Sequence, residues 1–217
     1  MKKIMFSEHY GLEQAVLAGT KTMTRRIIPI DLYNQTDWKA VAEGDFEAAV
    51  DGEGYYHDIR NCGKYRIGEE VAIAQAYKND GVLTYNAYNE DGTAREDGLQ
   101  RHKEMLDSKG YRNKMFVKAE YMPHRIRITD IKVERLQDIS DEDCLKEGVE
   151  LEDWRNEYKW GFYTSFFINA RTGGQGSRSV WYNFPQKAFG GLIDRISGRG
   201  TWQSNPWVYV YTFELIK

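Results

Sequence analysis

The stretch Gly19-Thr20-Lys21-Thr22-Met23-Thr24-Arg25-Arg26 lies between two different sequence patterns. Before it, residues 7–17 are predicted to form a short helix with apolar positions on one face, and Gly19 is placed to end that helix. After it, residues 21–28 are predicted to form a strand that ends at Pro29, because proline has no backbone donor for a sheet. The basic stretch is therefore predicted to lie where a helix gives way to a strand.

Beyond this stretch the sequence alternates short apolar runs with polar segments. Turn residues separate the runs, which is typical of a β-rich chain. The predicted strands cover residues 71–77, 114–119, 125–134 and 207–216. The predicted helices run from a cap at Ser140 to Gly148, and from Pro185 to about Ile196.

Polar segments connect these elements, and we expect a single domain of residues 1–217. Residues 31–64 are interpreted as an elaborated loop. Residues 79–92 are predicted to be hairpin-like, because Asn79-Asp80-Gly81 and Asp91-Gly92 are turn signals. The glycine-rich residues 169–177 are predicted to be a mobile loop. Insertions into the domain are expected at about 31–64, 78–113 and 150–180.

The strand pattern predicts the fold class. In residues 125–134, Ile126, Ile128 and Ile131 alternate approximately with charged positions, so one face of this strand should be buried and the other exposed. Residues 207–216 are apolar on both faces, as expected for a central strand. The prediction is a mixed α/β, β-rich fold, namely a small β-barrel or pseudobarrel decorated with short helices.

The composition restricts the class of protein. A net charge of -3 and a pI near 5.9 do not give the broad positive field of a protein that grips duplex DNA, so nucleic-acid contacts would be local. No apolar run reaches the roughly 20 residues of a membrane span, so we expect a cytoplasmic protein without a membrane partner. Cys62 and Cys144 lack metal-ligand spacing, so we expect free thiols, no metal and no cofactor.

Four segments of the chain, in this order, resemble the ASCH family of the PUA-like superfamily, especially its longer phage-associated and bacterial members. They are residues 18–26, Ile67-Gly68-Glu69, residues 133–140 continuing to Glu147-Gly148, and residues 202–210. The resemblance implies a PUA-like pseudobarrel with a cleft that binds RNA. Where many long relatives have an Arg-Glu pair and a tryptophan, this chain has Ala74-Gln75-Ala76-Tyr77.

The resemblance also implies a chemistry. Some short members of the family hydrolyse N4-acetylcytidine to cytidine and acetate with a lysine, a threonine and a glutamate, which fall on Lys21, Thr24 and Glu147. Amide hydrolysis needs a nucleophile, a base and a group that stabilises the developing charge. Thr24 would be the nucleophile, and Lys21 the base if burial and neighbouring arginines lower its pKa. Glu147 would orient the lysine or shuttle a proton.

Further residues are candidates for ligand binding. They are Thr22, Arg25, Arg26, Arg125 and Arg127. Arg26 could anchor a phosphate or a ligand carbonyl. The alternative for all the arginines is that they are solvated charges on the exposed face of a strand.

Two geometric expectations accompany these assignments. In a regular strand, Lys21 and Thr24 would point to opposite faces, so a shared site requires an irregular backbone just after Gly19. Glu147 falls in the last turn of a helix, where a carboxylate is disfavoured by the helix dipole. Pairing with Lys21 would compensate for this, and the alternative is a solvated glutamate on the surface.

Three functions are compatible with the sequence. The first is binding of RNA or a modified nucleoside, which the resemblance and the local basic cluster favour. The second is an amidohydrolase that deacylates nucleosides similar to N4-acetylcytidine. The third is a phage or mobile-element interaction protein that keeps the fold without a ligand.

Overall fold

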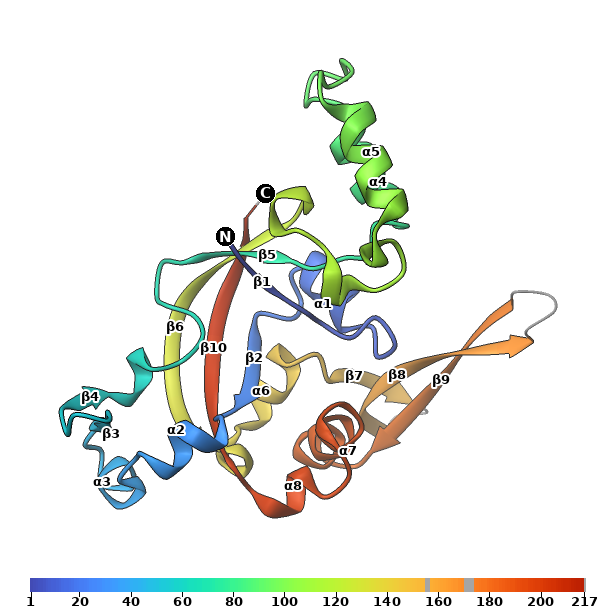
Figure 1. The fold of residues 1–217 in the computed structure, drawn as a ribbon. Coiled ribbons are helices and arrows are strands. Elements are labelled where there is room, and N and C mark those ends of the chain that lie inside the picture. Colours follow the sequence, from blue (N-terminus) through green and yellow to red (C-terminus); the bar gives the residue numbers. More distant parts are fainter. Residues whose placement is uncertain (155–156, 170–173, 217) are drawn as a thin grey trace. The chain divides into compact units, whose positions relative to one another are not determined.

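The computed structural model describes residues 1–154, 157–169 and 174–216 (Figure 1). Its strands are β1 (Lys2–Ile4), β2 (Met23–Ile27), β3 (Glu47–Val50), β4 (Tyr56–Asp58), β5 (Glu70–Ile73), β6 (Arg125–Arg135), β7 (Glu150–Trp154), β8 (Glu157–Asn169), β9 (Gly174–Tyr182) and β10 (Trp207–Ile216). Its α-helices are α1 (Leu12–Leu17), α2 (Ile30–Asn34), α3 (Trp38–Ala42), α4 (Asp80–Ala87), α5 (Gly98–Asp107), α6 (Asp141–Lys146), α7 (Pro185–Ser197) and α8 (Thr201–Ser204). Short 3-10 turns are η1 (Ile59–Asn61), η2 (Lys109–Tyr111), η3 (Lys114–Phe116), η4 (Ala119–Tyr121) and η5 (Leu136–Asp138).

The main sheet has five strands in the order β1-β5-β6-β10-β2. Strand β1 runs parallel to β5, whereas β5 pairs antiparallel with β6 and β10 antiparallel with β2, so the sheet is mixed. With several short helices, this confirms the predicted mixed α/β, β-rich class. The order is linear, with β1 and β2 at its ends, and no strand pairing within the described ranges closes the sheet into a barrel.

The chain divides into two compact units. The first contains Met1–Ser7, Glu70–Arg127 and Glu214–Lys217, and the second contains Glu8–Glu69 and Ile128–Phe213. Strands β6 and β10 therefore each belong partly to one unit and partly to the other.

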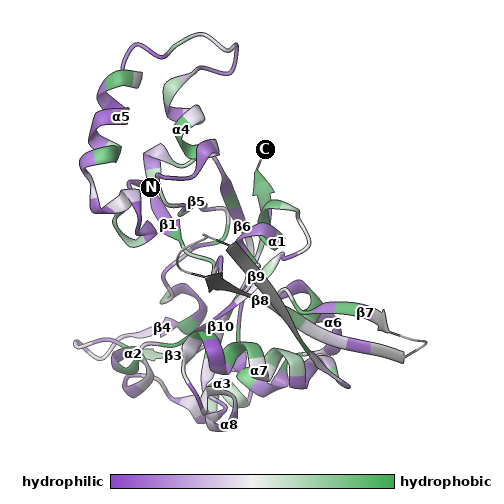
Figure 2. Ribbon diagram, turned by 90° about the vertical axis from the view of Figure 1, so that its right-hand side faces the viewer, coloured by the Kyte–Doolittle hydropathy of each residue, from purple (hydrophilic) through white to green (hydrophobic). Residues whose placement is uncertain are grey.

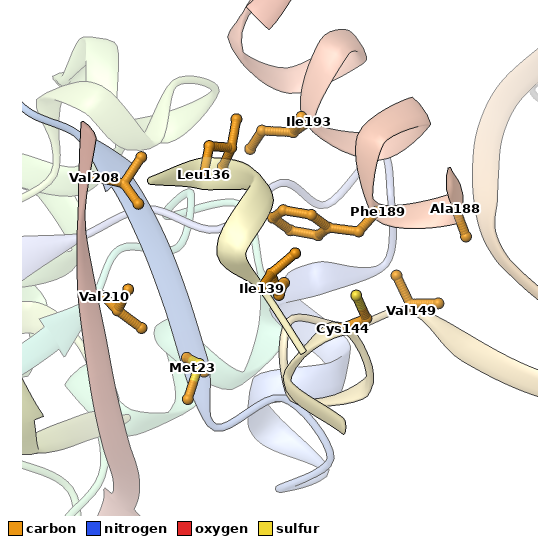
Figure 3. Packing of buried hydrophobic residues seen from close by; sticks show 10 residues of the cluster. All are labelled: Met23, Leu136, Ile139, Cys144, Val149, Ala188, Phe189, Ile193, Val208 and Val210. Carbon is orange, nitrogen blue, oxygen red and sulfur yellow. The ribbon is translucent and has the colours of Figure 1, made fainter. Parts of the chain in front are cut away.

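Each unit has a hydrophobic core of its own. In the first unit the core lies among β5, α4, α5 and η4, and its members are Ala72, Ala74, Tyr77, Val82, Met105, Val117, Tyr121 and Met122. In the second unit the core joins β2, β10, α6 and α7 (Figure 3), and its members are Met23, Leu136, Ile139, Cys144, Val149, Ala188, Phe189, Ile193, Val208 and Val210. Helix α7 carries both hydrophobic and hydrophilic residues along its length (Figure 2), and its buried side faces this core.

The two strands with the clearest sequence pattern form where they were predicted. Strand β6 buries Ile126 and Ile128 and then Ile131 and Val133, so the alternation shifts by one residue between Ile128 and Ile131. Strand β10 lies between β6 and β2 and is buried over most of its length, which confirms a central strand. Helices α6 and α7 also begin as predicted, at the Ser140 cap and at Pro185.

Several predictions for the polar segments are wrong. Residues 114–119 form the turns η3 and η4 instead of a strand, because the Asn113 side chain accepts the Met115 amide and bends the chain. Residues 79–92 include α4 instead of a hairpin, since Asn79 caps that helix. Asparagine and aspartate favour both turns and helix N-caps, so the sequence signal was ambiguous.

The remaining insertions are more regular than predicted. Residues 31–64 hold α2, α3, β3 and β4, with Asp37 capping α3. Residues 150–180 supply most of a three-stranded antiparallel sheet in the order β7-β8-β9. Part of the predicted glycine-rich loop, residues 170–173, lies outside the described residues. Both cysteines are free, as predicted, and burial raises the pKa of the Cys144 thiol to about 12.

Candidate functional site

The backbone is irregular just before β2, as a shared site requires. Helix α1 ends at Leu17, and Gly19 adopts a left-handed conformation with φ 77°. The amides of Thr20 and Lys21 then both donate to the carbonyl of Ala15, at 2.9 and 3.0 Å. Strand β2 begins only at Met23, so Lys21 precedes the strand. The alternation of side chains between the two faces of the sheet therefore does not apply to Lys21.

The register of β2 against β10 decides which face each side chain takes. Thr24 lies opposite Tyr211 and Arg26 opposite Tyr209, and directly opposed residues of an antiparallel pair share a face. Because neighbouring residues alternate, Arg25 points to the other face, where the second unit's core packs. Thr24 and Arg25 therefore belong to opposite sides of the sheet.

Lys21 lies along the open edge of β2. The amide of Phe213 donates to the carbonyl of Thr22, so the even-numbered residues of β2 form the backbone hydrogen bonds with β10. The carbonyl of the odd-numbered Met23 therefore points away from β10, toward the open edge of the sheet. Lys21 Nζ donates to this carbonyl at 2.7 Å. The ammonium group thus satisfies a backbone acceptor at the peptide group that immediately precedes Thr24.

The same ammonium group closes the end of α6. Lys21 Nζ donates to the Glu147 carbonyl at 2.7 Å and to Glu147 Oε2 at 2.8 Å, and the Thr22 amide donates to the Lys146 carbonyl. Only 2% of Lys21 and 4% of Glu147 is exposed. The predicted pairing of Lys21 with Glu147 is therefore confirmed, and a cation at the negative end of the helix compensates for the carboxylate there.

Arg25 lies among three carboxylates. Its Nε and Nη2 donate to Glu134 Oε1 at 3.1 and 2.7 Å, and Nη2 also reaches Asp143 Oδ2 at 3.3 Å. Its Nη1 donates to Glu147 Oε1 at 3.1 Å. The two oxygens of Glu147 are thus divided between two cations, with Oε1 on Arg25 and Oε2 on Lys21.

We call Lys21, Arg25, Glu134, Asp143, Lys146 and Glu147 the charged network. Lys146 joins it through Asp143 Oδ1 at 3.0 Å, so among the described side chains three cations face three carboxylates. Buried charges are tolerated when they are paired and hydrogen-bonded, and removal of one partner leaves the other unpaired. The charged network therefore fixes β2, β6 and α6 to one another at Arg25.

The surroundings of Lys21 act on its pKa in opposite directions. Burial lowers the pKa of its ammonium group, and the positive charges of Arg26 and Arg25 lower it further. The Glu147 carboxylate raises the pKa. The net effect is a pKa below the ordinary value of 10.5. A lysine that loses its proton more readily is suited to act as a base. In the observed arrangement, however, its three N–H donors each face an acceptor, which corresponds to the charged form.

The other predicted site residues are not brought into this network. Thr24 is buried, and the hydrogen bonds of the charged network do not involve its hydroxyl. Thr22 and Arg26 are half-buried. Arg127 pairs with Glu70 and Glu214, both at 3.1 Å, and Arg125 lies 3.9 Å from Glu70. Arg125 and Arg127 also belong to the first compact unit, whereas Lys21 belongs to the second.

Three members of the charged network were missed at the sequence level, namely Glu134, Asp143 and Lys146. Asp143 lies four residues before Glu147, so the two carboxylates share one side of α6. Glu134 follows the buried Val133 and therefore points to the opposite face of β6. Both signals are in the sequence, but only the pairing of strands shows that they meet at Arg25.

Comparisons of the chain with protein-family models, with curated proteins and with solved structures found no match. None of the helices in the described ranges is both long and apolar enough to cross a membrane. Among the described residues, no group of three or more His, Cys, Asp or Glu side chains is arranged to hold a metal ion.

Proposed function

We propose that the chain is an amidohydrolase of the ASCH type, with a PUA-like pseudobarrel, which removes the acyl group from an N4-acylated cytidine. The observation that carries the proposal is the buried contact of 2.8 Å between Lys21 Nζ and Glu147 Oε2. Catalysis requires the side chains of Lys21, Thr24 and Glu147 to converge. Lys21 and Glu147 meet at the open edge of β2, beside the peptide group that precedes Thr24, and this part of the requirement supports the proposal.

The proposed reaction assigns one role to each residue. Neutral Lys21 accepts the hydroxyl proton of Thr24 as Thr24 Oγ1 attacks the acyl carbon. The bond between that carbon and N4 breaks, and Lys21 returns the proton to N4, which leaves as the amino group of cytidine. Water then attacks the ester on Thr24, gives its proton through Lys21 to Oγ1, and releases the carboxylic acid. Glu147 holds Lys21 in place through both steps.

The resting arrangement sets a condition on this mechanism. With three acceptors around it, Lys21 Nζ is charged and has no lone pair to offer. Loss of a proton from the ammonium before the reaction is favoured by burial and by Arg25 and Arg26, which lower the pKa of Lys21. We expect kcat/KM to rise with pH through the pKa of Lys21, because the neutral amine is the active form, and to reach its plateau at a lower pH than an ordinary lysine would give.

Binding of a modified nucleoside is part of the same proposal, whereas a basic surface for long RNA receives less support. Arg25 is held by three carboxylates, and Arg127 is paired with two more. Thr22 and Arg26 are the remaining candidates for ligand contacts in the second unit. A single nucleoside needs only such local contacts, in agreement with the net charge of -3.

The test is incubation of the purified protein with N4-acetylcytidine, with release of cytidine followed by liquid chromatography. We expect release by the wild type and loss of release in Lys21→Ala and Lys21→Arg, since arginine keeps the charge but does not give up its proton. Circular dichroism checks that each variant is folded. If folded wild-type protein releases no cytidine but binds the nucleoside in calorimetry, the chain is a binding domain. If it does neither, the interaction protein without a ligand is favoured.

A further inference from the structure

Arg25 is buried and bound to carboxylates of the protein itself, unlike a solvated arginine or an arginine that is free to bind a ligand. It is only 5% exposed, and its guanidinium donates to Glu134 of β6, to Asp143 of α6 and to Glu147 at the C-cap of α6. A planar guanidinium with five donors in a fixed geometry holds several carboxylates in fixed directions. The sequence had suggested a nucleic-acid contact for this residue.

The division of the Glu147 carboxylate is the central observation. Arg25 Nη1 holds Oε1 at 3.1 Å, and Oε2 is 2.8 Å from Lys21 Nζ. The carboxylate cannot turn without breaking one of these contacts. Its direction toward Lys21 is therefore determined by Arg25.

We propose that Arg25 is a positioning residue for the Lys21–Glu147 pair: through Nη1 it holds Glu147 so that Oε2 faces Lys21, while Glu134 and Asp143 hold Arg25 itself. This inference rests on the proposed amidohydrolase function for its effect on catalysis. Its structural part, the control of Lys21 by Arg25, does not depend on that function. Arg25 itself touches no substrate in this scheme.

The charged groups around the pair define the expected direction of the effect. They are Arg25 and Arg26 on β2, Glu134 on β6, Asp143 and Lys146 on α6, and Glu147 at the C-cap of α6. Replacement of Arg25 by glutamine removes a positive charge near Lys21 and frees the Glu147 carboxylate from its second cation. Removal of the positive charge favours the charged form of Lys21, so its titration moves to higher pH.

The experiment is NMR of protein labelled with 13C and 15N in lysine, with the Lys21 side-chain signals assigned from their absence in Lys21→Arg. The variants are Arg25→Gln, Arg25→Lys and Glu134→Gln. Lys132→Gln is the control, because Lys132 is exposed on β6 and lies near Asp130 outside the charged network. The titration of Lys21 and the pH dependence of kcat are measured for each variant.

We expect Arg25→Gln to move the Lys21 titration and the rising limb of kcat to higher pH, with kcat at neutral pH reduced by about 10- to 100-fold and KM little changed. Arg25→Lys restores part of the shift, because it returns the charge without the fixed geometry. Lys132→Gln leaves both readouts unchanged. A role in folding alone would lower the amount of folded protein without moving the titration.

Unchanged Lys21 titration in folded Arg25→Gln and Arg25→Lys would overturn the inference. If Arg25→Gln does not fold, Glu134→Gln decides: a changed Lys21 signal supports the inference, and an unchanged signal contradicts it. If the wild type releases no cytidine, the proposed function fails. The NMR titration still tests Arg25 in that case, so the two failures are distinguishable.

Discussion

At the scale of single residues, the ammonium group of Lys21 donates hydrogen bonds to three acceptors. It satisfies the outward Met23 carbonyl of β2, the carbonyl of the α6 C-cap residue Glu147, and the Glu147 carboxylate. The first two are backbone groups at element ends, where unsatisfied acceptors are costly if buried. Lys21 is therefore part of the fold at the same place where the proposed chemistry needs it.

This double role gives a prediction for Glu147→Gln. Breaking a buried pair by removal of one partner leaves an uncompensated charge, so we expect the free energy of unfolding to fall by roughly 3 kcal/mol. Urea unfolding measures the change, and the exposed Glu142→Gln on the same helix is the matched control, expected within about 0.5 kcal/mol of the wild type. Equal effects of the two substitutions would contradict a stabilising pair.

At the scale of elements, α6 depends on the way it ends. The Gly148 amide donates to the Leu145 carbonyl and the Val149 amide to the Cys144 carbonyl, which is the pattern of a Schellman motif. Gly148 has φ 98°, a conformation that favours glycine. This turn places Glu147 against Lys21, so the geometry of the helix end supports the site.

We therefore predict that Gly148→Ala destabilises the protein. An added Cβ would meet Leu12 Cδ2 at 2.8 Å, and the left-handed backbone adds strain, for a total of about 2 to 3 kcal/mol. Gly44→Ala, with φ 93° and open space around its Cβ, isolates the backbone strain of about 1 to 2 kcal/mol. Thermal unfolding of the two variants compares them. A larger loss in Gly44→Ala would exclude a packing contribution at Gly148.

At the scale of the whole molecule, two compact units share two strands. Each unit has its own hydrophobic core, but β6 and β10 each pass from one unit into the other. A strand that loses its partners in one unit also loses part of its pairing in the other. Cooperative unfolding is the expected consequence.

This expectation can be tested with two probes. All six tryptophans, at positions 38, 154, 160, 181, 202 and 207, belong to the second unit, so their fluorescence reports on that unit. Circular dichroism in the far ultraviolet reports on the secondary structure of both. We predict coincident urea transitions for the two signals. Separate midpoints would show that the units unfold independently in spite of the shared strands.

The sequence by itself determined those features that depend on near neighbours. The Ser140 cap and Gly148 define α6, the alternating isoleucines define β6, and Gly19 ends α1. The Lys21–Glu147 pair was one of two alternatives at this level, since the sequence also allowed a solvated Glu147. Asn79 was misinterpreted, since an asparagine side chain favours both turns and helix N-caps.

Only the tertiary structure decided where Arg25 and Thr24 point. Two adjacent residues of β2 take opposite faces, and which face meets α6 depends on the register with β10, which lies nearly two hundred residues away in the chain. The partners of Arg25, namely Glu134, Asp143 and Glu147, come from two other elements that only sheet order and helix packing bring to it. Local sequence carries no information on such pairings, because the free energy that selects them comes from burial and charge compensation between distant segments.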